Sequence, residues 1–132
     1  MIDHTGVVVS DFEAGKRFYE RALGAIGPGK LREFPAAVTG HTDVAGFGPS
    51  GKAEFWISAA TAGQGSNKPP VHVAFRVDTR ANVDTFYAAA LAAGGTDNGG
   101  PGVRAHYHPN YYGAFVRDPD GHNIEAVCHA PG

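Results

Sequence analysis

Residues 113–127 read GAFVRDPDGHNIEAV and predict two strands joined by a tight turn. Pro119 fixes the φ angle at the second position of that turn, and Gly121 can adopt the positive φ that closes it. Apolar runs flank the turn on both sides, as is typical of a β-hairpin. Glu125 is the exception in the second run, because a buried carboxylate is costly unless a partner compensates its charge. Taken alone, Glu125 is best explained as an outward-facing side chain on a half-exposed strand.

The chain repeats itself with a displacement of 68 residues, which carries His4 onto His72. Further identities follow without a gap: Phe18 with Phe86, Tyr19 with Tyr87, Ala22 with Ala90, Leu23 with Leu91, and Gly27 with Gly95. Such a match indicates two copies of one structural unit, neither of which buries its apolar face alone. The sequence therefore predicts a tandem of two βαβββ units that share a core.

Each unit is expected to contain a strand, an amphipathic helix and three further strands. The Ser10-x-x-Glu13 spacing is that of a capping box and starts the first helix, whose apolar residues recur at helical spacing as far as Leu23. The second helix covers the apolar positions from Val83 to Leu91. The other apolar runs predict strands over residues 2–9, 31–38, 43–47, 53–59, 71–77, 103–108, 113–117 and 123–129.

These elements predict an α+β fold in one domain, residues 1–132, with a curved mixed sheet around a central cleft. Module one covers residues 1–60 and module two residues 71–132. Between them, residues 61–70 read TAGQGSNKPP, a polar, Gly-containing stretch that ends in two prolines and is interpreted as a linker.

Composition excludes several classes of function. A hydrophobic fraction of 42% and a charged fraction of 18% indicate a soluble globular chain. A net charge of −2 gives no electrostatic basis for binding nucleic acid or an anionic membrane, and the apolar runs are too short to span a bilayer. No secretory leader follows Met1, and the single cysteine, Cys128, fits a reducing compartment, so a cytoplasmic location is expected.

Two histidines and one glutamate form a candidate metal site. His4 and His72 occupy equivalent places at the start of the first strand of each unit, so facing sheets would direct both imidazoles into one cleft. Glu125, on the last strand of the second unit, can supply the carboxylate. Two imidazoles and a carboxylate suit a divalent first-row ion such as Zn, Ni, Fe or Mn and leave positions open for substrate.

The sequence resembles the vicinal oxygen chelate superfamily, which includes glyoxalase I, bleomycin resistance proteins, fosfomycin resistance enzymes and extradiol dioxygenases. The resemblance covers essentially the whole chain. It is carried by His4 with the following VVVSD and FY segments, by HVAF from His72, and by DPDGHNIE, which ends at Glu125. In the family the residues at these positions are metal ligands, which implies that His4, His72 and Glu125 bind the metal. Members that only bind drugs often lack these ligands, so their presence favours an enzyme.

Glyoxalase-like members use a second glutamate, on the last strand of the first unit. Glu54 is the only candidate here, and it lies eighteen residues before His72, a spacing that resembles that of glyoxalase I. Alignment of the two turn regions instead places Phe55 opposite Glu125, and a slip of one residue reverses the face of a strand. Glu54 is therefore either a fourth ligand or an ordinary solvent-facing charge.

A cluster of polar and aromatic residues, HYHPNYY, precedes the hairpin at residues 106–112. His106 or His108 could act as a general acid or base at the mouth of the cleft, or the cluster could be an exposed loop. Extradiol dioxygenases carry a tyrosine ten residues before the ligand glutamate. The residue at that position here is Phe115, which lacks the phenolic hydroxyl and therefore argues against catechol ring cleavage as the activity.

The resemblance implies a glyoxalase-I-like metal-dependent lyase or isomerase acting on a small carbonyl or thiol-adduct substrate. The metal would polarise two substrate oxygens, and Glu125 or Glu54 would move the substrate proton. Two alternatives stay open: another metal chemistry, either oxygen-dependent ring cleavage or thiol transfer to an antibiotic, and a metal-free module that binds an aromatic drug. A homodimer is expected, with the cleft contained in one chain or completed by a partner.

Overall fold

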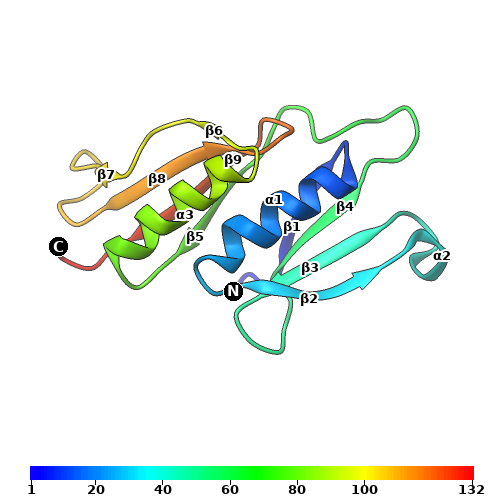
Figure 1. Cartoon of the computed structure of the whole chain (residues 1–132), viewed down its shortest axis with the longest axis horizontal. Coiled ribbons are helices and arrows are strands. Elements are labelled where there is room, and N and C mark those ends of the chain that lie inside the picture. Colours follow the sequence, from blue (N-terminus) through cyan, green and yellow to red (C-terminus); the bar gives the residue numbers. More distant parts are fainter.

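Two β-sheets lie side by side, one built by each half of the chain (Figure 1). The structure is a computed structural model and describes all 132 residues. The first half contains β1 (Thr5–Val9), α1 (Phe12–Gly24), β2 (Gly29–Phe34), α2 (Ala36–Thr39), β3 (Val44–Gly48) and β4 (Phe55–Ala59). The second half contains β5 (His72–Arg76), α3 (Arg80–Ala92), β6 (Thr96–Asp97), β7 (Gly102–Val103), β8 (Tyr112–Arg117) and β9 (Asn123–Cys128).

Both sheets are mixed and have related topologies, so the predicted α+β class is confirmed. The first has the strand order β1-β4-β3-β2, and the second has the order β5-β9-β8-β6, with β7 also paired to β8. The parallel pairs are β1 with β4 and β5 with β9, and all other pairs are antiparallel. Because β1 and β5 each stand at one end of the strand order, both are edge strands of their sheets.

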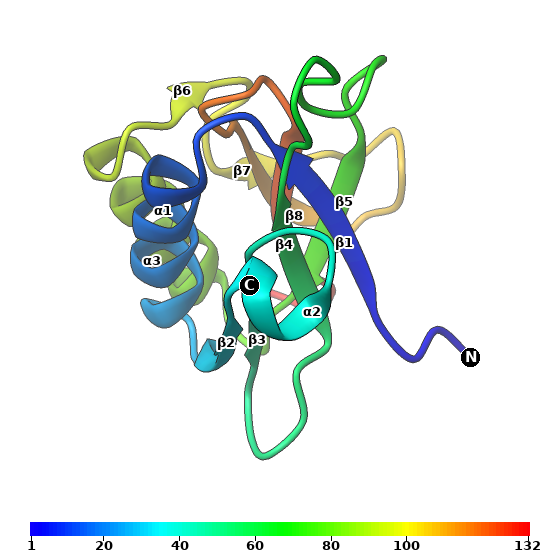
Figure 2. The same cartoon turned by 90° about the vertical axis from the view of Figure 1, so that its right-hand side faces the viewer.

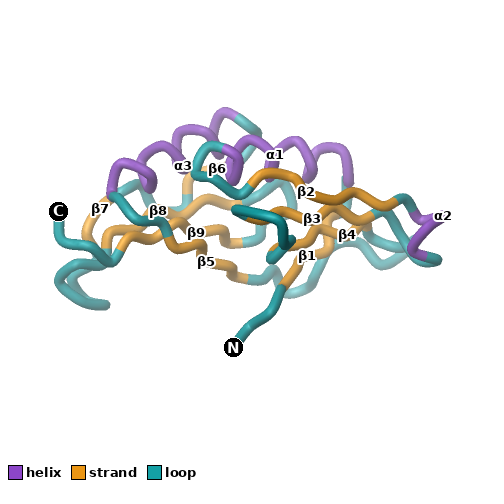
Figure 3. Tube along the Cα trace, turned by 90° about the horizontal axis from the view of Figure 1, so that it is seen from below, coloured by secondary structure: helices purple, strands orange, loops and turns teal.

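The helices α1 and α3 cover the same side of the two sheets (Figure 3). Alternate strand residues face them, because successive side chains in a strand point to opposite faces. Ile124 and Ala126 of β9, and Phe55 and Ile57 of β4, belong to one continuous core of buried residues that joins both halves. The opposite faces of both sheets carry no helix, and the N-terminal arm runs away from the helices on that side (Figure 2).

The start of α1 differs from the predicted capping box. Asp11, not Ser10, is the N-cap, and its carboxylate accepts a hydrogen bond from the amide of Ala14. Ser10 instead donates its backbone N–H and its hydroxyl to the carboxylate of Asp120. Because a partner from the second half of the chain engages Ser10, the cap moves one residue along.

Two predicted strands are shorter than expected. The predicted strand 31–38 ends at Phe34, where Pro35 interrupts it and becomes the N-cap of the short helix α2. The predicted strand 103–108 ends at Val103, because Arg104 begins a turn in which its carbonyl accepts from the amide of Tyr107. This second change releases residues 104–111 as an irregular loop beside β8.

The predicted turn between β8 and β9 joins the two halves of the molecule. The buried carboxylate of Asp118 accepts from the amides of Asp120 and His122 within the turn, and from the hydroxyl of Tyr19 in α1 at 2.6 Å. His122 is fully buried and bridges the halves: its Nδ1 accepts from the amide of Val71, so its Nε2 carries the proton and donates to the carbonyl of Val8.

Candidate functional site

Glu125 lies on the face of the second sheet that no helix covers, although its side chain is only 1% exposed. The neighbouring residues Ile124 and Ala126 point into the core, so strand alternation places Glu125 on the opposite face. Its buried carboxylate is satisfied by partners from two other segments of the chain. The outward-facing, solvated position suggested by the isolated stretch is therefore not what the fold provides.

His72 and Tyr111 each hold one oxygen of the Glu125 carboxylate. The Nε2 atom of His72 lies 2.8 Å from Oε1, because β5 runs parallel to β9 with Ala74 opposite Glu125 and His72 on the same face as Ala74. The hydroxyl of Tyr111 donates a short hydrogen bond to Oε2. Burial, and then the Glu125 carboxylate, raise the pKa of Tyr111 well above its ordinary value, so the phenol stays a proton donor.

These groups open into a pocket of about 420 Å³. Its walls come from β5, β8, the end of β9 and the loop between β7 and β8. The lining residues are His72, Tyr107, His108, Tyr111, Phe115, Glu125 and His129. A titratable cluster in a concave, partly apolar site is the usual arrangement of a small-molecule site.

Tyr111 and His129, two polar members of this pocket, were not individual candidates from the sequence, although Tyr111 belongs to the HYHPNYY cluster. Tyr111 stands in the irregular loop, where no periodicity indicates which way a side chain faces. His129 could have been found, because residues 125, 127 and 129 share one face if the alternation of β9 continues. His108, which was a candidate, lies in the pocket, and its Nε2 atom is 2.7 Å from Nδ1 of His129.

The structure places the other candidate histidines away from Glu125. His106 is exposed, packs its ring 4.1 Å from that of Tyr107, and does not line the pocket. His4 lies on the N-terminal arm just before β1, with its side chain 59% exposed and Nδ1 2.6 Å from a carboxylate oxygen of Asp3. Within one chain, no three His, Cys, Asp or Glu side chains gather closely enough to hold a metal ion.

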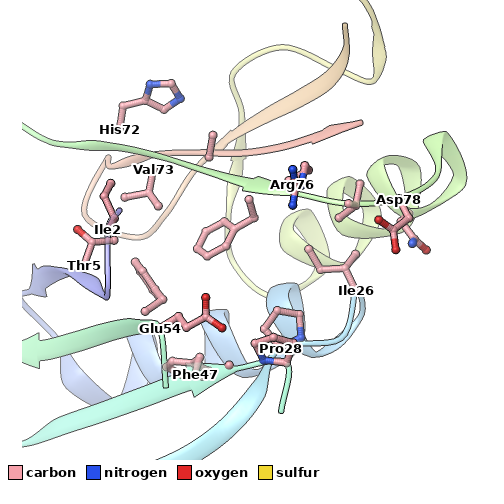
Figure 4. A pocket seen from close by; sticks show the side chains of 17 residues that line it. Ile2, Thr5, Ile26, Pro28, Phe47, Glu54, His72, Val73, Arg76 and Asp78 are labelled. Atoms are coloured by element: carbon pink, nitrogen blue, oxygen red, sulfur yellow. The ribbon is translucent and has the colours of Figure 1, made fainter. Parts of the chain in front are cut away.

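Glu54 also lies apart from Glu125. It is an exposed residue directly before β4 and lines a separate pocket of about 690 Å³ between the two halves. His72 reaches the rim of that pocket as well, but Figure 4 shows its imidazole and the Glu54 carboxylate on opposite sides of β5.

The register identifies the residue of the first half that corresponds to Glu125. Gly6 pairs with Trp56, as Ala74 pairs with Glu125, and the repeat carries Gly6 onto Ala74. Trp56 therefore takes the equivalent place, whereas the turn alignment had indicated Phe55, which is buried in the core. Gly46 provides the space: a Cβ there would lie 2.8 Å from the Trp56 ring.

The chemistry of the His72–Glu125 pair suits a divalent first-row cation. An imidazole nitrogen and a carboxylate oxygen that each lie about 2.1 Å from one ion are separated by about 3 Å. The observed Nε2–Oε1 distance of 2.8 Å is close to that value. The pair supplies two ligands, and a protein site for such an ion needs at least three.

Comparison with known proteins identifies one family for this chain. The model of the glyoxalase/bleomycin resistance protein/dioxygenase superfamily matches residues 1–126. A search of curated proteins gives no match. A glyoxalase/bleomycin resistance protein from Albidiferax ferrireducens T118 is similar in structure, with 29% identity, 98% of each chain covered and a TM-score of 0.76.

Two more distant structures share the fold. One is a glutamate-to-glutamine mutant of glyoxalase I from Zea mays, with 22% identity and a TM-score of 0.73; the match covers 96% of this chain and 46% of that one. The other is a glutamate-to-glutamine mutant of a fosfomycin resistance protein from Listeria monocytogenes, complexed with Mn(II) and 1S,2S-dihydroxypropylphosphonic acid. It has 16% identity and a TM-score of 0.63, with 96% and 88% of the two chains covered. None of the helices here is long and apolar enough to cross a membrane.

Proposed function

Because the chain belongs to the glyoxalase/bleomycin resistance protein/dioxygenase superfamily, we propose that it is a metal-dependent lyase or isomerase of the glyoxalase I kind. Its substrate would be a small carbonyl compound or the adduct of such a compound with a thiol. The observation that carries the proposal is the pairing of His72 with the buried Glu125 in a pocket of substrate size.

His72 and Glu125 would hold the cation together with His4 from a second copy of the chain. His4 is exposed and precedes β1, while His72 lies in β5, and these are the edge strands of the two sheets. Edge strands present unpaired backbone groups and readily associate with another chain. A homodimer that sets β1 of one chain near β5 of the other would bring the three ligands together.

The bound cation would supply Lewis-acid polarisation of two substrate oxygens. A carboxylate, either Glu125 or Glu54 of the second copy, would accept a proton from the carbon beside the carbonyl and return it to the neighbouring carbon. The phenol of Tyr111 would keep the Glu125 carboxylate oriented. Phe115 and Tyr107 would exclude water from one side of the pocket.

Metal analysis and a lyase assay on freshly purified protein test this function. We expect about one divalent ion per chain and turnover of the methylglyoxal–thiol adduct after loading with Zn, Ni, Mn or anaerobic Fe. His72→Ala and Glu125→Gln should each lower activity by about 100-fold or more, since loss of a ligand exceeds the effect of losing its outer-shell support.

His41→Ala is the control, because His41 is exposed on the first half of the molecule and lines neither pocket. The function proposed here is rejected if the wild-type protein holds no stoichiometric metal, or if both ligand variants keep full activity.

A cytoplasmic location stays a prediction from the lone cysteine, Cys128.

A further inference from the structure

The hydrogen bonds of His108 and His129 determine where their protons lie. The Nδ1 atom of His108 accepts from the amide of Asn110 at 3.0 Å, so the proton of the neutral ring is on Nε2. That Nε2–H points at Nδ1 of His129, 2.7 Å away, and Nδ1 must act as the acceptor. His129 therefore carries its own proton on Nε2.

The Nε2–H of His129 is therefore a hydrogen-bond donor that the contact between His108 and His129 does not use. The Nε2 atom of His129 has no hydrogen-bond partner in the chain, although the residue lines the pocket that holds Glu125. The ring of Tyr111 lies edge-on to both histidines, at 5.4 Å from each ring centre, and its hydroxyl reaches Glu125. The pair is thus packed onto the same side chain that holds the Glu125 carboxylate.

We propose that His129 is the residue that donates a hydrogen bond to a substrate oxygen in this pocket, and that His108 positions it. The proposal rests on the function proposed above, since that function defines an oxygen-rich substrate bound beside Glu125. An oxygen that accepts a hydrogen bond, as in a carbonyl, an alkoxide or a carboxylate, fits the Nε2–H; an ammonium group does not.

His108 acts by selecting the tautomer. With its Nε2–H directed at Nδ1 of His129, the opposite tautomer of His129 would set two N–H groups against each other. The backbone amide of Asn110 anchors the other side of the His108 ring. The resulting order, amide to His108 to His129 to substrate, fixes the direction of every donor along the line.

Nitrogen NMR of the histidine rings in metal-free protein tests the tautomers independently of any activity. We expect both His108 and His129 to carry their proton on Nε2 near neutral pH. In His108→Phe the ring of His129 should instead show a mixture of tautomers. A wild-type His129 that carries its proton on Nδ1 would overturn the proposal.

Binding of acetohydroxamate, a two-oxygen chelator, to Zn-loaded protein tests contact with the ligand. His129→Phe should weaken binding about tenfold, the value of one net hydrogen bond. His108→Phe should weaken it less, and His108→Gln should restore part of the loss, because the amide N–H of Gln can donate to His129. His41→Gln is the matched control and should bind as the wild type does.

The outcomes separate this inference from the proposed function. If acetohydroxamate binds and His129→Phe weakens it, but no adduct is turned over, the lyase function fails and the role of His129 stands. If Zn content, acetohydroxamate affinity and turnover are all unchanged in His129→Phe, the role of His129 is refuted and the lyase function stands.

Discussion

At the scale of single residues, Glu125 shows how a costly group is stabilised. A carboxylate that is 1% exposed needs partners for both oxygens, and His72 and Tyr111 provide one each. The Tyr111 hydroxyl occupies one oxygen as a donor, so it restricts the carboxylate to one free edge. The same contact that lowers the cost of burial therefore also orients a prospective ligand.

Replacing Tyr111 by Phe tests this double role. Loss of the hydroxyl leaves one buried oxygen of Glu125 without a donor, so we expect metal-free protein to lose about 1–3 kcal/mol of unfolding free energy. Affinity for Zn, measured by chelator competition, should fall about 10-fold to 100-fold. Tyr112→Phe is the matched control, because that hydroxyl donates to the exposed carboxylate of Asp84. Equal effects of the two variants would contradict the orienting role.

At the scale of elements, the turn between β8 and β9 has a structural function beyond closing a hairpin. Asp118 binds two amides of its own turn and the Tyr19 hydroxyl of α1, and Asp120 binds Ser10 at the start of the same helix. The turn thus fixes how the first half of the chain lies against the second. Since β9 continues directly from this turn, it also fixes the position of Glu125.

Tyr19→Phe should lower the unfolding free energy by about 1–3 kcal/mol near neutral pH, because Asp118 then keeps a buried oxygen without its donor. Tyr87→Phe is the control at the equivalent place of the repeat, where the hydroxyl contacts an exposed carboxylate, that of Asp97. Urea titrations of both variants measure the difference. If Tyr19→Phe loses no more unfolding free energy than Tyr87→Phe, the hydrogen bond from Tyr19 to Asp118 does not stabilise the fold.

The same variant has a defined effect of pH. Burial, and then Asp118, raise the pKa of Tyr19 well above its ordinary value of 10.0. The native state therefore keeps a proton that the unfolded chain releases, so this stabilisation is complete below pH 10.0 and is lost as the pH rises toward the native pKa. Wild-type stability should fall more steeply above that pH than the stability of Tyr19→Phe.

At the scale of the whole molecule, the single chain contains the parts of the predicted metal site without assembling them. Both helices cover one side of the sheets, and the N-terminal arm projects from the other side (Figures 2 and 3). His72 and Glu125 therefore lie on the open face, and His4 lies on the arm. A site contained in one chain does not agree with this arrangement, since no three ligands gather. The site shared by two chains stays a prediction, and mixing variants can test it.

His4→Ala and His72→Ala should each be inactive alone but regain activity when mixed. In a heterodimer, one site receives both substitutions and the other receives none. Random exchange of equal amounts makes half of the dimers mixed, so about one quarter of the wild-type activity is expected. A mixture of His72→Ala with Glu125→Gln is the control. Each site takes both of these residues from one chain, so every site in the mixed dimer keeps one substitution and should stay inactive. No recovery in the first mixture would exclude a shared site.

Local patterns were enough to predict the α+β class, the repeat and the β8–β9 hairpin, because turn chemistry, helical spacing and strand alternation act over a few residues. The sequence also indicated His72 and Glu125, although only the parallel pairing of β5 with β9 shows that they touch. The orientation of Tyr111 required the tertiary structure, since it lies in an irregular loop. Only the fold shows that this loop meets His129 at the end of β9, through contacts distant in sequence. Likewise, the distance of His4 from Glu125 depends on how two whole sheets pack, which no local pattern encodes.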